Sequence, residues 1–184
     1  MSEAHARDLD GVRVGVLTVS DRVAAGARDD AGGSALCELL EGAGATLVSR
    51  AVVPDEREPI AAALRALTAD ADVVLTTGGT GLGPRDLTPE ATRAVLDREA
   101  PGIVEALRHA SLAITPFAML SRATAGLVGR VLVVNLPGNP KAVREEWAVL
   151  APVLAHAVET ARGPVPDEAH QHPPEHHWPA RRGR

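Results

Sequence analysis

Residues 72–90 read DVVLTTGGTGLGPRDLTPE and change character twice. The stretch begins with a β-branched apolar run, which is typical of a strand buried on both faces. It then becomes rich in glycine and threonine, and it ends in a helix start, with Thr88 as the predicted N-cap and Pro89 at the first helical position. A buried strand followed by a turn and a helix is the repeating unit of a parallel α/β sheet.

Three other apolar runs have the same character, at residues 12–19, 46–53 and 131–136. Helical patterns are predicted at residues 31–43, 58–68, 89–98, 101–113 and 141–161. Strands that alternate with helices predict an α/β fold with an open, mainly parallel sheet and right-handed crossovers. An additional strand at residues 118–124 is predicted to pair antiparallel beside the last core strand.

Length and composition indicate one folded domain. The chain has 184 residues, enough for a single core, and we expect the domain to span residues 12–163. Residues 1–11 are expected to form a flexible N-terminal arm. Residues 164–184 are rich in proline and histidine and have no apolar period, so a disordered tail is expected there.

Charge and cysteine content exclude several classes of protein. The formal net charge is −5, so binding to nucleic acid or to a membrane surface through broad basic charge is not expected. No apolar run reaches transmembrane length, and the polar start does not resemble a signal peptide. Cys37 is the only cysteine, which excludes an internal disulfide and a cysteine-based zinc cluster. A cytoplasmic protein is expected.

Polar or glycine-rich turns follow all four predicted core strands. If the strands are parallel, these turns meet at the carboxyl edge of the sheet, where open α/β sheets bind their ligands. The turn residues are Ser20 and Asp21 after the first strand, Asp55 after the second, Gly78, Gly79, Thr80 and Gly81 after the third, and Pro137, Gly138 and Asn139 after the fourth.

The turn after the third strand is the most specific of the four. Its glycines allow successive backbone N–H groups to point into one concavity, which suits a phosphate, and Thr76, Thr77 and Thr80 supply hydroxyl groups nearby. It is not a Walker A loop, because no Lys-Ser/Thr follows the last glycine. An ordinary strand-to-helix turn is the alternative, but threonines interleaved with glycines favour anion binding.

Two aspartates are candidates to hold Mg²⁺ or to position a phosphate through it. Asp55 and Asp86 each follow a strand, although Asp55 could equally be a turn residue after Pro54. Asp86 precedes the predicted helix cap, so no structural role is evident for it. Ser121 and Arg122 offer a hydroxyl group and a cation, and a solvated edge strand would look the same.

Glycines are unusual in the first turn of the helix at residues 31–43. Gly32 and Gly33 cost helix stability, so close approach of a ligand or of another chain is expected there. Asp29 and Asp30 precede this helix and are expected to include its cap. The histidines and Cys37 do not form a Ser-His-Asp or Cys-His arrangement with other residues.

Taken in order, these motifs resemble the molybdopterin-binding fold of the molybdopterin adenylyltransferases and their MogA/MoaB-type relatives. The resemblance rests on TTGGTG at residues 76–81, RDLTPE at 85–90, SDR at 20–22, PDE at 54–56, Pro101-Gly102 with Glu105 and Arg108, SR at 121–122, and LPGNP at 136–140. It covers residues 12–163.

The resemblance implies a three-layer α/β/α fold, a homotrimer, and binding of molybdopterin and Mg-ATP on one rim. It also implies adenylyl transfer to the pterin phosphate, with release of pyrophosphate, before an enzyme of the same pathway inserts the metal. Residues 76–81 would hold the pterin phosphate, Asp55 and Asp86 would be the essential carboxylates, and Ser121 would line the site. A non-catalytic pterin-binding member and a trimeric scaffold are the alternatives.

The implied chemistry agrees with the residues present. The nucleophile would be a phosphate monoester with a second pKa near ~6, which is already largely anionic at neutral pH. No general base is then required, and the enzyme must supply alignment and charge stabilisation instead. The lack of a histidine or cysteine nucleophile is consistent with this reaction.

Overall fold

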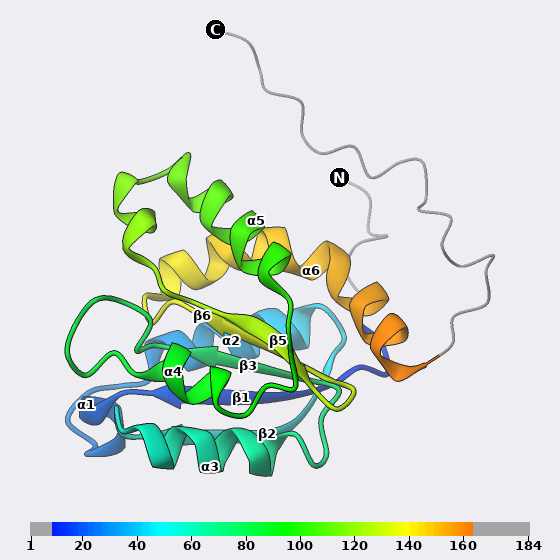
Figure 1. Ribbon diagram of the computed structural model, residues 1–184, viewed down its shortest axis with the longest axis horizontal. Helices are drawn as coiled ribbons and strands as arrows, with labels where there is room; N and C mark the ends of the chain where they lie inside the picture. Colours follow the sequence, from blue (N-terminus) through cyan, green and yellow to red (C-terminus); the bar gives the residue numbers. More distant parts are fainter. Residues whose placement is uncertain (1–8, 164–184) are drawn as a thin grey trace, which may run out of the picture.

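Four neighbouring parallel strands form the larger part of the six-stranded sheet in the computed structural model, which describes residues 9–163 (Figure 1). They lie in the order β2-β1-β3-β6, so the sequence prediction of a mainly parallel α/β sheet is confirmed. The four strands are β1 (Arg13–Val19), β2 (Thr46–Val53), β3 (Val73–Thr77) and β6 (Val131–Leu136). Because they are parallel, their carboxyl ends all reach one edge of the sheet.

The antiparallel end of the sheet differs from the prediction. The strand predicted at residues 118–124 is wrong: residues Pro116–Leu120 form the 3-10 helix η2, and the strand that pairs with β6 is β5 (Ala125–Val128). Pro116 fixes a helical φ angle and removes a backbone donor, and the Thr115 hydroxyl accepts the N–H of Phe117, which favours a helical turn. A two-residue strand, β4 (Arg98–Glu99), completes this edge beside β5.

Helices cover both faces of the sheet, giving the three-layer α/β/α arrangement (Figure 1). One face packs against α2, α5 and α6, and the other packs against α3 and α4. The helices are α1 (Asp21–Ala24), α2 (Ala31–Gly42), α3 (Arg57–Leu67), α4 (Thr88–Arg93), α5 (Pro101–Leu112) and α6 (Pro140–Arg162). No helix within residues 9–163 combines the length and the apolar character needed to cross a membrane.

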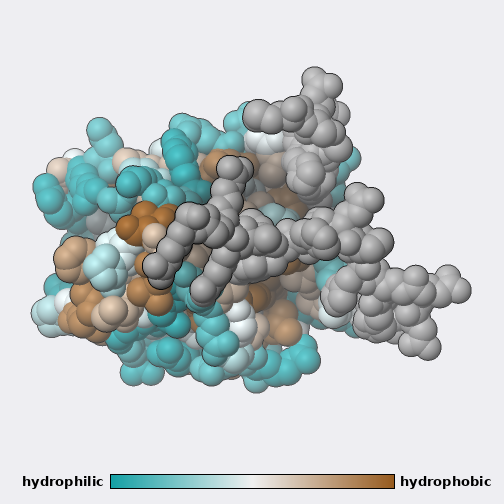
Figure 2. All heavy atoms as spheres, turned by 90° about the horizontal axis from the view of Figure 1, so that it is seen from above, coloured by the Kyte–Doolittle hydropathy of each residue, from teal (hydrophilic) through white to brown (hydrophobic). Residues whose placement is uncertain are grey.

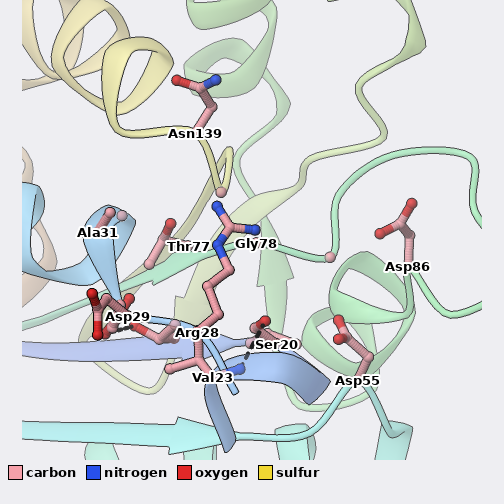
Figure 3. A pocket seen from close by; sticks show the side chains of 16 residues that line it. Ser20, Val23, Arg28, Asp29, Ala31, Asp55, Thr77, Gly78, Asp86 and Asn139 are labelled. Atoms are coloured by element: carbon pink, nitrogen blue, oxygen red, sulfur yellow. Dashed lines mark hydrogen bonds between the residues drawn. The ribbon is translucent and has the colours of Figure 1, made fainter. Parts of the chain in front are cut away.

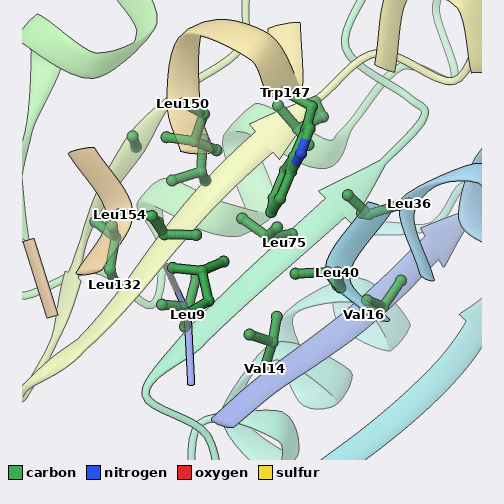
Figure 4. Packing of buried hydrophobic residues seen from close by; sticks show 14 of the residues in the cluster. Leu9, Val14, Val16, Leu36, Leu40, Leu75, Leu132, Trp147, Leu150 and Leu154 are labelled. Carbon is green, nitrogen blue, oxygen red and sulfur yellow. The ribbon is translucent and has the colours of Figure 1, made fainter. Parts of the chain in front are cut away.

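The core is aliphatic apart from Trp147 and divides between the two faces of the sheet. Alternate side chains of a strand point to opposite faces, so Val14 and Val16 pack with α2 and α6 while Leu17 packs with α3. Figure 4 shows Leu36 and Leu40 of α2 facing the strands near Trp147 of α6. Burial of these side chains from both layers fixes the sheet and therefore the position of its carboxyl edge.

Two boundaries differ from the sequence prediction. Leu9, assigned to the flexible arm, is fully buried and its N–H donates to the carbonyl of Ala43 at 3.1 Å, so the folded part begins earlier than residue 12. Residues 1–8 and 164–184 lie outside the described residues. Helix α4 ends at Arg93 rather than at residue 98, because the chain turns there to enter β4.

Candidate active site at the carboxyl edge of the sheet

A cavity of about 370 Å³ lies at the carboxyl ends of the parallel strands (Figure 3). Its walls come from segments that are far apart in the sequence but meet at this edge. The lining residues are Thr18, Val19, Ser20, Val23, Arg28, Asp29, Asp30, Ala31, Gly32, Asp55, Thr77, Gly78, Gly79, Asp86, Gly138 and Asn139. The edge of the sheet that the sequence predicts for ligand binding therefore carries a cavity.

The cavity brings together many of the predicted site residues. Those that line it are Ser20, Asp55, Thr77, Gly78, Gly79, Asp86, Gly138 and Asn139. The others, which do not line it, are Asp21, Thr76, Thr80, Gly81, Ser121 and Pro137. Several of the residues that do not line the cavity, such as Asp21, Thr76 and Pro137, form hydrogen bonds that support the residues lining it or the sheet beside it.

Close packing of the turn against the end of β1 and the start of α4 requires glycine at residues 78 and 79. Gly78 and Gly79 have φ angles of 99° and 64°, in the left-handed region that side chains with a Cβ rarely adopt. A Cβ on Gly78 would overlap the carbonyl oxygen of Val19, and a Cβ on Gly79 would overlap the Thr88 hydroxyl. The turn is therefore held open and free of side chains where it meets the cavity.

The two threonines before this turn have different roles. The Thr77 hydroxyl donates to the carbonyl of Pro137 at 2.8 Å and so fixes the turn after β6 beside the glycines. Thr76 points to the opposite face, where the Asn135 amide donates to the hydroxyls of Thr76 and Thr92 at 3.1 and 3.0 Å. Thr76 is therefore a buried network residue rather than part of the cavity wall.

Thr88 belongs to the helix rather than to its cap. The N-cap of α4 is Leu87, and the Thr88 hydroxyl donates to the carbonyl of Gly78 at 2.9 Å. The Thr88 N–H also donates to the carbonyl of Gly79 at 3.1 Å. These two bonds fix the start of α4 to the glycine-rich turn, a structural role that replaces the predicted cap.

Asp55 and Asp21 are joined by two hydrogen bonds, in each of which the backbone N–H of one residue donates to the carboxylate of the other. The N–H of Asp21 donates to Asp55 Oδ2 at 2.7 Å, and the N–H of Asp55 donates to Asp21 Oδ1 at 3.0 Å. Arg85 binds both carboxylate oxygens of Asp21, at 2.6 and 2.7 Å. This pairing with Arg85, aided by the Asp55 backbone N–H, lowers the pKa of Asp21. Asp21 therefore supports Asp55 and is itself neutralised.

Asp55 is in a less favourable environment. Burial raises the pKa of its carboxyl group, and the negative charges of Asp21 and Asp86 raise it further, against the hydrogen bond from the Asp21 backbone. A cation between Asp55 and Asp86 would relieve this repulsion, and carboxylate oxygens are the ligands that Mg²⁺ prefers. The residues present therefore fit a magnesium site completed by substrate phosphates.

Asp86 has a structural contact that the sequence did not reveal. Its Oδ2 atom accepts the N–H of Gly83 at 2.7 Å, and its own N–H donates to the carbonyl of Gly83 at 3.0 Å. A Cβ on Gly81 or Gly83 would lie 2.8 Å from the same carboxylate oxygen, so the glycines leave space for it. The expectation that Asp86 lacks a structural role was wrong.

A metal site built from protein groups alone is not present in the described residues. No cluster of three or more His, Cys, Asp or Glu side chains that could hold a metal ion occurs within residues 9–163. Mg²⁺ is usually held by one or two carboxylates together with substrate phosphates. Asp55 and Asp86 fit that second arrangement.

The cavity also includes residues that the sequence analysis did not place at the site. Asp30 is the N-cap of α2 and accepts the N–H of Gly33 at 2.9 Å and the Thr18 hydroxyl at 2.7 Å. Arg50 of β2 donates to the same carboxylate at 2.7 Å. Burial opposes ionisation of Asp30, but these hydrogen bonds outweigh it and lower the pKa. The expected cap is confirmed, and its contact with Arg50 could not be read from the sequence.

Gly32 and Gly33 are explained by contacts within the chain. A Cβ on Gly32 would lie 2.7 Å from the carbonyl oxygen of Gly138 and 2.9 Å from Thr77 Oγ1. A Cβ on Gly33 would overlap the carboxylate of Asp30 and the hydroxyl of Thr18. The close approach predicted for this turn is real, but the approaching atoms belong to the same chain.

Arg28 is the cation that lines the cavity. Figure 3 shows its side chain extending from the loop before α2 toward Thr77 and Gly78. No motif marks it in the sequence, and only its position before the cap of α2 could have suggested it. It faces a lining that contains four aspartates, so it adds a positive charge beside the glycine-rich turn.

A family model described as "Probable molybdopterin binding domain" matches residues 15–156, which include every segment that lines the cavity. The chain belongs to this molybdopterin-binding-domain family. The match agrees with the motifs at residues 76–90 and 136–140, which lie at the carboxyl edge of the sheet.

The chain spans very different shares of the relatives that it matches. The chain is 42% identical over 142 residues to the molybdopterin adenylyltransferase of Escherichia coli, covering 74% of this chain and 72% of that one. It is 40% identical over 156 residues to gephyrin from Dictyostelium discoideum, which covers 79% of this chain, and it spans only 22% of gephyrin's length.

A solved structure shares the fold along nearly its whole length. The molybdopterin biosynthesis enzyme MoaB from Thermus thermophilus superposes with a TM-score of 0.78 at 47% sequence identity. The match covers 83% of this chain and 98% of that one. The three-layer α/β fold implied by the sequence motifs is therefore confirmed for the described residues.

Proposed function

We propose that this protein acts in molybdenum cofactor biosynthesis and transfers the adenylyl group of ATP to the phosphate of molybdopterin. The observation that carries the proposal is the cavity in which Asp55 and Asp86 share a wall with the glycine-rich turn. A pair of carboxylates beside backbone N–H groups suits a substrate that brings both a metal ion and several phosphates.

The chain supplies binding and orientation rather than a nucleophile. An oxygen of the molybdopterin phosphate attacks the α-phosphorus of ATP, and the bond from that phosphorus to the bridging oxygen breaks, so pyrophosphate leaves with the bonding electrons. Gly78 and Gly79 present the turn that holds the pterin phosphate, while Thr77, Gly138 and Asn139 form the neighbouring wall. Aligning the two phosphates supplies much of the rate enhancement.

Asp55 and Asp86 would hold Mg²⁺ together with ATP. When bound, Mg²⁺ supplies positive charge that neutralises the phosphate oxygens during transfer. The raised pKa of Asp55, caused by burial and by the charges of Asp21 and Asp86, supports this assignment, because a nearby cation restores the ionised form. Arg28 adds a second positive charge in the same cavity. A reaction that consumes ATP also fits the cytoplasmic location expected from the sequence.

A homotrimer is proposed as the working assembly. Several large apolar side chains of the α5–η2 region are exposed to solvent, and we call them the apolar surface: Leu112, Ile114, Phe117, Met119 and Leu120. Figure 2 views the molecule from the side of α5 and α6 and shows apolar residues among polar ones. Exposed patches of this kind are typical of protein contacts. A stable monomer in light scattering at micromolar concentration would exclude the trimer.

A direct assay tests the proposed function. Purified protein is mixed with molybdopterin and Mg-ATP, and the expected products are adenylyl-molybdopterin and pyrophosphate in equal amounts. Tight pterin binding without product would identify a non-catalytic pterin-binding protein instead. Product formation followed by consumption on addition of a metal-inserting enzyme of the same pathway would support the proposed partner.

A further inference from the structure

Arg122, between η2 and β5, binds the segment that carries Asp86. Its guanidinium group donates to the carbonyl of Gly81 at 2.6 Å, to the carbonyl of Asp86 and to the carboxylate of Glu90. Its backbone N–H donates to the carbonyl of Thr80 at 2.9 Å. A planar guanidinium with several fixed donors can hold such divergent acceptors, whereas a lysine ammonium cannot reproduce this geometry.

The segment from Gly81 to Leu87 needs such an anchor. It has no regular secondary structure, and Leu82 at its tip is 64% exposed. Leu87 at its end packs against the core, whereas the Gly83–Asp86 turn and the pairing of Arg85 with Asp21 are exposed. Arg122 contacts the segment at Gly81 and at Asp86 itself, so it fixes the backbone from which the Asp86 carboxylate enters the cavity.

The ion pair between Arg122 and Glu90 is partly shielded from water. The two side chains are 33% and 35% exposed, and Glu90 Oε2 is buried without a hydrogen-bond partner. A carboxylate in this setting depends on its cation, because removing one partner of a shielded pair leaves an uncompensated charge. The pair therefore joins Arg122 firmly to the first turn of α4.

Arg122 is itself held by α5. Arg108 of that helix donates to the carbonyl of Ser121 at 3.2 Å and to that of Ala123 at 3.5 Å, on either side of Arg122. The end of α5 and the following 3-10 helix η2 carry the apolar surface defined above. A continuous set of contacts thus runs from α5 through residues 121–123 to Asp86.

We propose that Arg122 is a positioning residue for Asp86 and hence for the metal and phosphates at the cavity. Arg122 does not line the cavity, so it acts through Asp86 rather than on the substrate. This inference rests on the proposed adenylyl transfer for its effect on rate. Its effect on the order of the 81–87 segment is independent of that function.

The test compares Arg122→Ala and Arg122→Lys with Arg144→Ala as a matched control. Arg144 also forms an ion pair, with Glu38 at 3.1 Å, but on the surface away from the cavity, where such pairs contribute little stability. For each variant, kcat, KM for molybdopterin, the Mg²⁺ requirement and the melting temperature are measured. Hydrogen–deuterium exchange of residues 81–87 gives a readout that does not depend on activity.

Arg122→Ala is expected to lower kcat on the order of 100-fold, the usual effect of a small displacement of a reacting group. The Mg²⁺ concentration for half-maximal rate should rise about 10-fold or more, as when a ligand loses its supporting contacts. KM for molybdopterin should stay near that of the wild type, and exchange in residues 81–87 should accelerate. Added guanidinium ion should restore part of kcat, and Arg122→Lys should recover less than half of the loss.

Two results would overturn the inference. In the first, Arg122→Ala matches the wild type in kcat, Mg²⁺ requirement and exchange. In the second, pterin affinity and melting temperature fall in proportion to kcat in both Arg122 variants, which would make Arg122 a general stability residue. An inactive wild type would refute the proposed function alone, because faster exchange in Arg122→Ala would still support the anchoring of Asp86.

Discussion

Asp30 and Asp55 line the same cavity, but their carboxylates have opposite environments. Asp30 accepts hydrogen bonds from Gly33, Thr18 and Arg50, which outweigh burial and lower its pKa. Asp55 accepts one backbone N–H and lies near the negative charges of Asp21 and Asp86, so burial and these charges raise its pKa. One carboxylate is already satisfied by the protein, and the other gains most from an added cation.

This contrast separates structural from functional acids on one rim. A carboxylate that the fold neutralises contributes to stability, and its loss should weaken the fold. A carboxylate kept near other negative charges costs stability, and such strain is concentrated at functional sites. The two aspartates should therefore respond in opposite directions to the same Asp→Asn change, and the following experiments test that expectation.

The largest effect is expected for the two proposed metal-binding acids. Asp55→Asn and Asp86→Asn should each lower adenylyl transfer by roughly a hundredfold or more, the usual result of losing a major electrostatic contributor. Pterin binding should change far less, because the glycine-rich turn remains intact. Steady-state rates and the dissociation constant of molybdopterin are measured for both variants, and Asp30→Asn is measured in the same way for comparison. Intact transfer in both variants would refute the proposed mechanism.

The next effect concerns the glycine-rich turn. Gly79→Val should weaken molybdopterin binding by roughly tenfold or more, because the side chain overlaps Thr88 and the backbone strain is of order 1–3 kcal/mol. Gly129→Val is the matched control: Gly129 has a similar φ of 58°, but no atom lies within 4 Å of the place that its Cβ would take. Equal losses of pterin affinity in the two variants would assign the effect to strain rather than to the cavity.

A smaller effect on stability is expected for Asp30→Asn. Because the folded-state pKa of Asp30 is lowered, its contribution is present above the unfolded pKa near 3.8 and is lost as pH falls through the folded pKa. Near pH 7 the variant should lose about 1–2 kcal/mol, because the neutral amide no longer pairs with the Arg50 guanidinium as a carboxylate does. Denaturant unfolding at several pH values measures the change in the free energy of unfolding. Asp29→Asn, at the exposed neighbouring residue, is the control. If the stability loss of Asp30→Asn stayed the same below pH 3.8, the lowered pKa of Asp30 would be contradicted.

The smallest effect is a gain in stability for Asp55→Asn without Mg²⁺ or nucleotide. A raised folded-state pKa means that the ionised form costs stability, and this cost appears as pH rises through the folded pKa and is absent below the unfolded pKa near 3.8. At pH 7 the melting temperature should rise by about 2–4 °C for each kcal/mol of repulsion removed. Calorimetry at pH 7 and near pH 3.5 compares the melting temperatures of Asp55→Asn and the wild type. A lower melting temperature of the variant at pH 7 would show that the ionised Asp55 stabilises the fold, contrary to this prediction.

The sequence predicted the parallel half of the sheet better than the antiparallel edge. Strands β1, β2, β3 and β6 appear within about a residue of their predicted bounds, because their β-branched, apolar residues give a local signal. The expected burial on both faces is wrong for β2, which lies at the edge of the sheet and is largely exposed. The strand predicted at residues 118–124 was displaced to Ala125–Val128, because Pro116 begins a short helix just before it. The family motifs also indicated which edge of the sheet would carry the site.

The amino-acid sequence by itself determined the four parallel strands, the main helices between them, the glycine-rich turn and the clustering of polar turns at one edge. These features depend on residues that are close together in the chain, such as the threonines and glycines at 76–81. Only the tertiary structure decided that Asp30 is neutralised by Arg50, that Asp55 remains near other acids, and that Arg122 holds Asp86. Such differences depend on charges brought together from separate strands and loops, so they have no local sequence signal beyond the helix cap formed by Asp30.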